Sequence, residues 1–229
     1  MTIVSLASKI FFRELKSGQL LLMFLSLSLA VGIVASITFF TDRLDSSLMY
    51  ESKQFLGGDL KYESSTPLDE SVFPDGDYSY TTVYEFGSVL SSDKNFQLAS
   101  IKSVSSPYPL VGEIEILNSD SKQIVRKKPP AIGKVWLDAR LASLLEVAVD
   151  EIVSIGEKNF SVSGIILSES DRGAGSFAFA PKAIMNSFDL EEANVIQPGS
   201  RVRYSYVFVG SQEAIKLLEN FFQSKKKPG

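Results

Sequence analysis

The segment Ser168–Ser176 gathers the residue types with the clearest chemical potential. Its run Gly173-Ala174-Gly175-Ser176 suggests a phosphate-binding loop, but the full G-x-x-x-x-G-K-[ST] pattern and a clear strand-to-helix setting are absent. Its serines lie near Asp171 and Arg172, yet there is no G-x-S-x-G elbow and no lysine placed to act as a base. The segment is therefore predicted to be a loop without nucleotide or acyl-transfer chemistry.

The sequence contains no histidine and no cysteine. Their absence excludes Ser-His-Asp and Cys-His catalysis, zinc sites built from these ligands, and a histidine pH switch. The adjacent carboxylates Asp69-Glu70 and Glu191-Glu192 diverge from one another and do not match a calcium loop, so we interpret them as solvated charges. We expect no enzyme activity, and no catalytic, cofactor-binding or metal-binding residue is predicted.

The composition of the 229 residues, 45% hydrophobic with a net charge of -4, suits one folded domain plus a membrane anchor. It argues against nucleic-acid binding, which requires a basic surface. The segment Asn118–Pro130 is locally basic through Lys122, Arg126, Lys127 and Lys128, and it is predicted to be an exposed loop. Either it is simply solvated, or it contacts anionic headgroups or a partner.

The segment Leu20–Phe40 contains 21 residues without a charge. As a helix it measures about 31 Å, which matches a hydrocarbon core of about 30 Å and predicts a transmembrane span. A cleaved signal peptide is the alternative, although its apolar region is usually shorter and ends in small residues. The flanks differ in charge, with Lys9, Arg13 and Lys16 before the span and Asp42, Arg43 and Asp45 after it. The positive-inside rule then leaves the N-terminus in the cytoplasm and the main domain on the periplasmic side of a bacterial inner membrane.

Helical periodicity is present on both sides of this span. Residues 1–18 are predicted to form an interfacial elbow helix, with a plain cytoplasmic tail as the alternative. Beyond the span, Leu44, Leu48 and Phe55 continue the helical spacing until Gly57-Gly58 supplies a stop. A transmembrane helix with a stalk is therefore predicted over residues 19–56.

Short alternating runs from Asp59 onward predict a mixed α+β domain over residues 57–224, followed by a basic tail over 225–229. The predicted strands are Leu60–Tyr62, Tyr80–Leu90, Phe96–Val104, two strands on either side of the turn Gly156–Asn159, Phe177–Ala180 and Arg201–Val209. The predicted helices are one capped by Asp138 and running through Leu145, one from Pro181 to about Ser187, and a final helix capped by Ser211.

The order of several segments resembles the N-terminal part of a MacB/FtsX-type ABC transporter permease, similar to the YbbP-like permeases linked to lysophospholipase. These segments are FFREL, LSLSLAVG, DRLDSSL, QFLGGDL, LASIKSV, YPLVGEIEI, VWLDARLASLLEV, FSVSGII, APKAIMN and IQPGSRVRYSYVF. The resemblance covers nearly the entire chain. Gly57, Gly58, Asp59 and the segment Gln197–Arg201 match the family pattern, and we interpret them as turn and cap positions rather than as a functional site.

The resemblance implies a permease subunit that works as a dimer with a separate P-loop ATPase. It also implies a mechanical role in moving lipids, lipoproteins or other envelope substrates, or in signalling to a periplasmic partner protein. Such permeases have further transmembrane helices, whereas this sequence ends without another apolar run, which suggests a truncated or split form. Two alternatives stay open: a single-pass scaffold that binds an envelope partner, and a tethered periplasmic enzyme.

Overall fold

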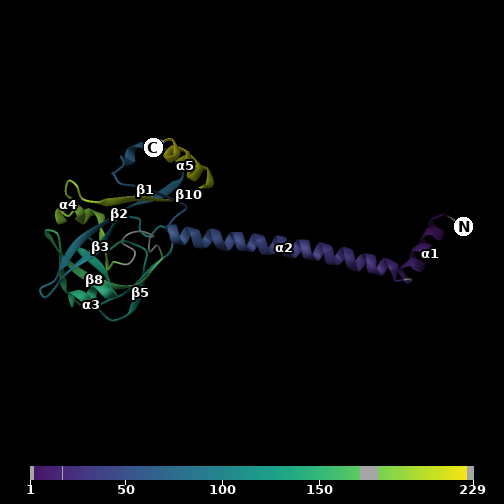
Figure 1. Ribbon diagram of the computed structural model, residues 1–229, viewed down its shortest axis with the longest axis horizontal. Helices are drawn as coiled ribbons and strands as arrows, with labels where there is room; N and C mark the ends of the chain where they lie inside the picture. Colours follow the sequence, from purple (N-terminus) through teal and green to yellow (C-terminus); the bar gives the residue numbers. More distant parts are fainter. Residues whose placement is uncertain (1–2, 17, 171–179, 226–229) are drawn as a thin grey trace. The chain divides into compact units, whose positions relative to one another are not determined.

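The computed structural model describes residues 3–16, 18–170 and 180–225, and the chain divides into two compact units, Met1–Glu51 and Ser52–Gly229 (Figure 1). The first unit contains α1 (Ile3–Lys16) and most of α2 (Gln19–Leu56). The second unit contains the end of α2 and a sheet-rich core domain. The predicted α+β fold class is confirmed, whereas the assignment of residues 1–18, 19–56, 57–224 and 225–229 as separate segments stays a prediction.

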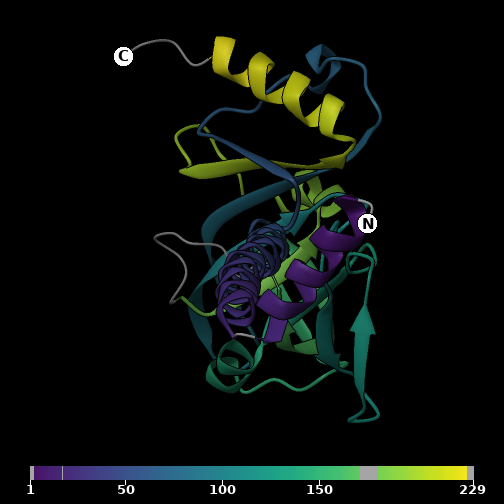
Figure 2. The same ribbon diagram turned by 90° about the vertical axis from the view of Figure 1, so that its right-hand side faces the viewer.

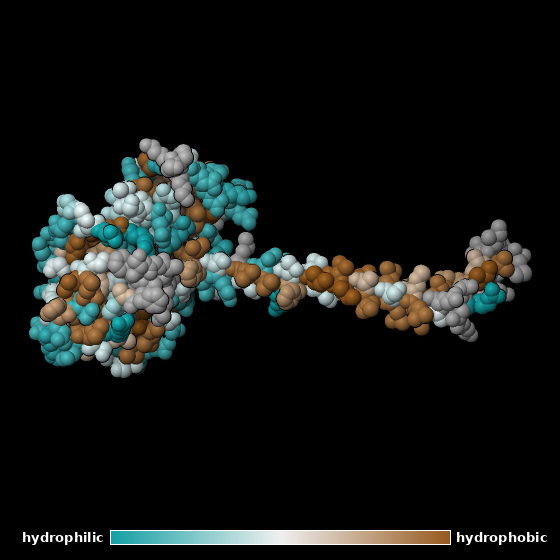
Figure 3. Space-filling view, in the orientation of Figure 1, coloured by the Kyte–Doolittle hydropathy of each residue, from teal (hydrophilic) through white to brown (hydrophobic). Residues whose placement is uncertain are grey.

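Helix α2 is continuous over 38 residues. Its length is about 57 Å at roughly 1.5 Å per residue. Within it, Leu20–Asp45 has a mean hydropathy of 2.5, and none of its most apolar window is buried. Figure 3 shows the apolar side chains following one another along this helix. Among the described residues this is the one helix long and apolar enough to cross a membrane, judged by length and composition.

Helix α1 presents apolar side chains that nothing covers. Leu6, Ile10, Phe11 and Phe12 are all exposed, and Arg13 is exposed beside them. A helix with this mixture suits the boundary between lipid headgroups and acyl chains, where apolar side chains are buried and cations reach phosphate. Its placement at a membrane interface stays a prediction.

The core domain is built on a ten-stranded sheet in which nine strands follow the order β1-β10-β2-β3-β9-β6-β8-β4-β5, and β7 pairs with both β2 and β8. The strands are β1 (Leu60–Ser64), β2 (Tyr78–Ser91), β3 (Phe96–Val104), β4 (Ile114–Leu117), β5 (Gln123–Arg126), β6 (Lys134–Asp138), β7 (Ile152–Ile155), β8 (Lys158–Glu169), β9 (Lys182–Asn186) and β10 (Val202–Gly210). Short helical segments connect them: η1 (Glu70–Val72), α3 (Ala139–Leu145), η2 (Ser187–Asp189) and α4 (Leu190–Ala193). Helix α5 (Gln212–Lys225) follows the last strand.

Six of these strands close into a ring. The pairing runs from β2 to β3, β9, β6, β8 and β7, and β7 returns to β2 through Leu90↔Ile155 and Ser91↔Ser154. Most neighbours are antiparallel, but β3 with β9 and β6 with β8 are parallel. Such a mixed arrangement lacks the regular βαβ alternation of a doubly wound sheet.

Apolar side chains from these six strands fill the inside of the ring. Alternate residues point inward, as the repeating burial of Phe160 and Val162 in β8 illustrates. Helix α3 adds Leu141 and Leu145 to the same cluster, and both are fully buried. Asp138 caps α3 by accepting a hydrogen bond from the backbone N–H of Leu141, as predicted.

A second apolar cluster lies between α5 and the outer strands β1 and β10, and Figures 1 and 2 show α5 across these strands. Phe73 stands edge-on to Tyr206, Phe208 and Phe222, with ring centroids 5.5–5.8 Å apart. This spacing is typical of stabilising aromatic pairs. Leu218 and Phe222 form the buried face of α5, as its helical spacing predicted.

Three predictions are wrong in whole or in part. Ser168 and Glu169, predicted to begin a loop, form the end of strand β8. The segment that follows Pro181 is strand β9 rather than a helix, because Ala183, Ile184 and Met185 are buried between β3 and β6 in the centre of the sheet. Residues 118–130 are not all loop, because Gln123–Arg126 form β5 against β4. The strand predicted at 177–180 and the Gly-rich segment 173–176 lie outside the described residues, except for Ala180.

Candidate functional site

The junction between α2 and the core domain is the first site with a clear structural role. Gly57 follows the last helical residue and has φ of +74°, a left-handed conformation that ends a helix at little cost when the residue is glycine. Gly58 then lies against β10, where an added Cβ would be 2.6 Å from a methyl group of Val207 and 2.7 Å from the carbonyl oxygen of Phe208. Only a residue without a side chain fits this approach.

Asp59 fastens the junction to β10. Its backbone N–H donates to the carbonyl oxygen of Phe208 at 2.8 Å, and its Oδ2 accepts from the backbone N–H of Gly210 at 3.2 Å. Its other carboxylate oxygen lies 2.7 Å from Nζ of Lys53, in the last turn of α2. The last turn of the helix is thus tied to the sheet by one ion pair and two hydrogen bonds.

The core domain also contains a buried ionic cluster that the sequence did not reveal. Glu169 accepts hydrogen bonds from Nζ of Lys102 and of Lys182, each at 2.7 Å, and from the hydroxyl of Tyr108 at 3.2 Å. The side chains of Glu169 and Lys102 are each only 3% exposed. Nζ of Lys102 also lies 5.0 Å from the centre of the Tyr108 ring.

This cluster has the residue types of an acid–base catalytic site, but its carboxyl group is not in the protonated form that a general acid needs. Burial alone raises the pKa of Glu169, but the charges of Lys102 and Lys182 outweigh it and lower the pKa to about 2. The carboxylate is therefore ionised at neutral pH and has no proton to donate, and both of its oxygens already accept hydrogen bonds. We interpret the cluster as an internal brace between β3, β8 and β9.

Three of the four adjacent carboxylates singled out in the sequence have side-chain partners among the described residues, and Glu192 forms its ion pair with Lys158. Asp69 caps η1 by accepting from the backbone N–H and hydroxyl of Ser71, and Glu70 accepts from the hydroxyls of Tyr80 and Thr82. Within residues 3–16, 18–170 and 180–225, no three carboxylate, histidine or cysteine side chains gather in a metal-binding arrangement.

The two serines of the 168–176 segment that the structure describes differ in role. Ser170 bonds to the backbone of Glu113 in both directions, at 3.1 and 3.0 Å, and no such side-chain bond is seen for Ser168. Asp171, Arg172 and Ser176 lie outside the described residues. A nucleophile role for this segment therefore gains no support from the two serines that are described.

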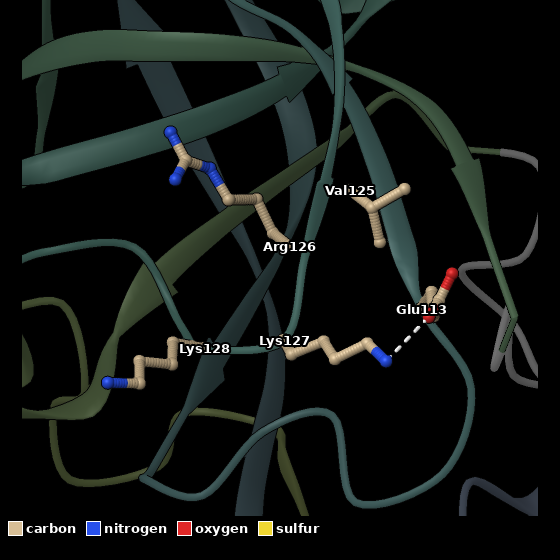
Figure 4. A pocket seen from close by; sticks show the side chains of 5 residues that line it. All are labelled: Glu113, Val125, Arg126, Lys127 and Lys128. Atoms are coloured by element: carbon tan, nitrogen blue, oxygen red, sulfur yellow. Dashed lines mark ion pairs between the residues drawn. The ribbon is translucent and has the colours of Figure 1, made fainter.

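The basic segment forms a shallow pocket at the edge of the sheet. It has a volume of about 470 Å³ and is lined by Glu113, Val125, Arg126, Lys127 and Lys128 (Figure 4). Nζ of Lys127 lies 2.8 Å from the Glu113 carboxylate, and this hydrogen bond raises the pKa of Lys127. Figure 4 shows Arg126 and Lys128 extending away from Glu113.

Sequence reasoning identified the cations of this pocket but missed the carboxylates that organise it and the core. Glu113 reaches Lys127 because the β4–β5 hairpin folds back on itself, and a pairing across that hairpin requires a register that the sequence does not show. One feature of the sequence could have indicated the buried cluster. Lys102 interrupts the segment Leu98–Val104, whose other residues are all apolar or small. A lysine in such a run requires a buried counter-charge, but nothing in the sequence marks Glu169 as its partner.

No family model matches the chain. The chain is similar to the uncharacterized ABC transporter permease YbbP of Escherichia coli (strain K12). The two sequences are 29% identical over 221 residues, and the match covers 95% of this chain. The resemblance to YbbP-like ABC transporter permeases of the MacB/FtsX type is confirmed. The chain spans only 27% of the length of YbbP.

Two solved structures are also similar to the chain. The periplasmic region of MacB from Actinobacillus actinomycetemcomitans shows 14% identity, with 68% of this chain and 71% of that chain covered and a TM-score of 0.45. The extracellular domain of YknZ from Gram-positive bacteria shows 10% identity, with 65% and 78% covered and a TM-score of 0.42. The α+β class of this chain follows from its own strands and helices.

The positions that match the YbbP-like pattern lie at turns. Gly57, Gly58 and Asp59 form the junction described above. In the segment Gln197–Arg201, the backbone N–H of Ser200 donates to the carbonyl oxygen of Gln197 at 2.9 Å, and Gly199 has φ of +91°. These residues shape the backbone before β1 and before β10, which pair with each other.

We predict that Gly58→Ala lowers the stability of the core domain by about 1–3 kcal/mol, because its methyl group collides with a backbone carbonyl that cannot rotate away. Unfolding of the full chain in detergent by urea, followed through the fluorescence of Trp136, measures this. Trp136 is the one tryptophan and is buried in the core domain. Gly32→Ala is the matched control, since an added Cβ there meets nothing within 4 Å. Equal stability of the two variants would contradict the steric account.

We predict that the stability contributed by Glu169 is present above pH 4.5 and lost as the pH falls toward 2. The pKa of Glu169 is lowered on folding from 4.5 to about 2, so the unfolded chain binds the proton first. Glu169→Gln should cost about 3 kcal/mol at neutral pH, because Lys102 and Lys182 both lose their ion pair with Glu169, and should flatten the acid dependence.

Urea unfolding at a series of pH values measures this effect. Tyr108→Phe, which removes the hydroxyl that donates to Glu169 and no charge, should keep the acid dependence and lose about 1 kcal/mol. Glu219→Gln, on the exposed face of α5, should match the wild type. An unchanged acid dependence in Glu169→Gln would refute the assignment.

Proposed function

We propose that the chain is a permease subunit, or the N-terminal part of one, in an ABC-type system that exports envelope substrates or transmits mechanical force. The observation that carries this proposal is the similarity to the permease YbbP over 95% of the chain. The substrates are envelope molecules such as lipids or lipoproteins. The system is completed by a separate P-loop ATPase and by a second permease subunit.

The absence of nucleotide chemistry in the sequence supports a separate ATPase. The 229 residues contain no G-x-x-x-x-G-K-[ST] motif. The buried Glu169 cluster has no open position for a substrate, because each of its carboxylate oxygens accepts a lysine hydrogen bond. The chain therefore acts through binding and movement rather than as an enzyme.

The build of α2 supports a mechanical role. The helix continues without a break from its apolar stretch to Leu56, and its last turn is tied to β10 through Asp59. Backbone hydrogen bonds make a helix stiff along its axis, and the left-handed Gly57 is followed at once by a paired strand. Movement of this last turn therefore reaches β1 and β10 through paired backbone.

One observation favours the alternative, a single-pass scaffold that binds an envelope partner. An apolar patch lies on the outer face of the β2–β3 hairpin, where Val89 is paired with Leu98 and Ser91 with Phe96. The side chains of Val89, Leu98 and Phe96 are 51%, 63% and 80% exposed, respectively. Exposed apolar patches often mark interaction sites, and a periplasmic partner of the permease is equally compatible with this surface.

The proposed location is the bacterial inner membrane, with the N-terminus in the cytoplasm and the core domain in the periplasm. Because the chain has no cysteine, single-cysteine variants test this directly. We predict that Lys94→Cys, in the β2–β3 turn, reacts with a membrane-impermeant maleimide in intact spheroplasts. Ser5→Cys, in α1, should react only after lysis. The opposite pattern would reverse the orientation.

We predict that the full tagged chain, extracted from its native membrane in detergent, retains a P-loop ATPase that mass spectrometry identifies. An unrelated tagged single-pass membrane protein is the control. Recovery of an ATPase with this chain, but not with the control protein, would support the permease proposal. Recovery of envelope proteins without any ATPase would reject the permease proposal in favour of the scaffold.

A further inference from the structure

We propose that the pocket lined by Glu113, Val125, Arg126, Lys127 and Lys128 binds a phosphate group. Three cations and one carboxylate line this pocket, which leaves a formal surplus of two positive charges. The whole chain carries a net charge of -4, so the local charge runs against the rest of the molecule. The inference is independent of the permease function, because it rests only on this edge of the core domain.

The register of the β4–β5 hairpin keeps one nearby carboxylate away from Arg126. Arg126 is paired with Ile114 and therefore lies on the same face of the hairpin as that residue. Glu115 is paired with Val125, and its carboxylate accepts a hydrogen bond from the side chain of Gln123 at 2.8 Å on the opposite face. The strand pleat thus separates Glu115 from the guanidinium group.

Glu113 neutralises one cation and leaves two. Its carboxylate lies 2.8 Å from Nζ of Lys127, and its backbone is fixed by the hydroxyl of Ser170, which both donates to it and accepts from it. Within the described part of the chain, no carboxylate forms an ion pair with Arg126 or Lys128. These two side chains extend away from Glu113 in Figure 4.

The remaining features of the pocket suit phosphate. A guanidinium group offers paired N–H donors that match two phosphate oxygens, and an ammonium group adds a compact charge. The pocket volume of about 470 Å³ is larger than the volume of an inorganic phosphate ion. Val125, 47% exposed, also lines the pocket, from the face of β5 opposite to Arg126. The shared chemistry is that of a lipid headgroup or of a soluble phosphate ester.

A simpler interpretation is that these cations only keep the edge strand soluble. Lysine and arginine on an edge strand discourage unwanted strand pairing. This interpretation explains the charge of β5. It does not explain why Glu113, whose backbone is hydrogen-bonded to Ser170, forms an ion pair with Lys127. It predicts no preference between phosphate and other anions, and the two interpretations therefore differ in a measurable way.

The test is calorimetric titration of the full chain, held in phosphatidylcholine nanodiscs, with inorganic pyrophosphate at low salt. Wild type should bind saturably at millimolar or lower concentrations. The double variant Arg126→Gln/Lys128→Gln should bind at least roughly tenfold more weakly, since it loses both unpaired cations. Glu113→Gln should bind about threefold more tightly, because it releases Lys127.

Lys122→Gln is the matched control. It removes one positive charge from the turn of the same hairpin, where Lys122 lies 4.0 Å from Asp120 and does not line the pocket. Its affinity should match the wild type. Trp136 fluorescence verifies that each variant is folded. Absence of binding by the wild type, equal binding by the double variant, or equally strong binding of a hexaglutamate peptide would each overturn the proposal.

Two further titrants distinguish the sources of phosphate. Dihexanoyl phosphatidylglycerol represents a lipid headgroup and glycerol phosphate a soluble ester, with dihexanoyl phosphatidylcholine as the neutral reference. Tighter binding of phosphatidylglycerol, lost in the double variant, assigns the pocket to anionic lipid. Equal binding of both anions, also lost in the double variant, assigns it to the phosphate group alone. Failure to recover an ATPase would leave these results unchanged.

Discussion

The closure of six strands into a ring around an apolar interior is the constraint on which the rest of the core domain depends. Strand β7 makes this closure with only four residues, by pairing with β8 along its length and with the end of β2. Once the ring is closed, the inward side chains of all six strands share one water-free space. Helix α3 completes it with Leu141 and Leu145, so the strand positions cannot change independently.

Buried ion pairs add a second set of contacts between the strands and the segments beside them. Glu169 at the end of β8 holds Lys102 of β3 and Lys182 of β9 together beside the buried Tyr108. Asp189 performs a similar task beyond β9, since it is fully buried and pairs with Lys158 at 2.7 Å. Buried ion pairs add little net stability compared with apolar contacts, but removing one partner is costly, and they therefore favour a single arrangement.

The strands outside the ring receive the end of α2 at one edge and form the basic pocket at the other. Strands β1 and β10 receive the last turn of α2 and the aromatic side of α5, and β4 with β5 forms the basic edge at the other end of the pairing order. A rigid ring between these two regions keeps their separation fixed. This division suits the mechanical role proposed above for this chain.

Local pattern was sufficient where a signal lies within one segment. The apolar stretch of α2, the stop at Gly57, the cap at Asp138 and the β2–β3 hairpin follow from hydropathy, backbone preference and short-range hydrogen bonding. Such signals remain valid whatever the rest of the chain does. The absence of histidine and cysteine, and of a nucleotide motif, similarly restricted the chemistry before any fold was known.

The tertiary structure alone decided the elements and sites that depend on distant residues. The run after Pro181 has the composition of either a helix or a strand, and it becomes β9 because it lies between β3 and β6. Lys102 and Glu169 are 67 positions apart, and Glu113 and Ser170 are 57 apart. Pairs at these separations depend on the folded domain, since the free energy of burial that brings them together is shared by all of its elements.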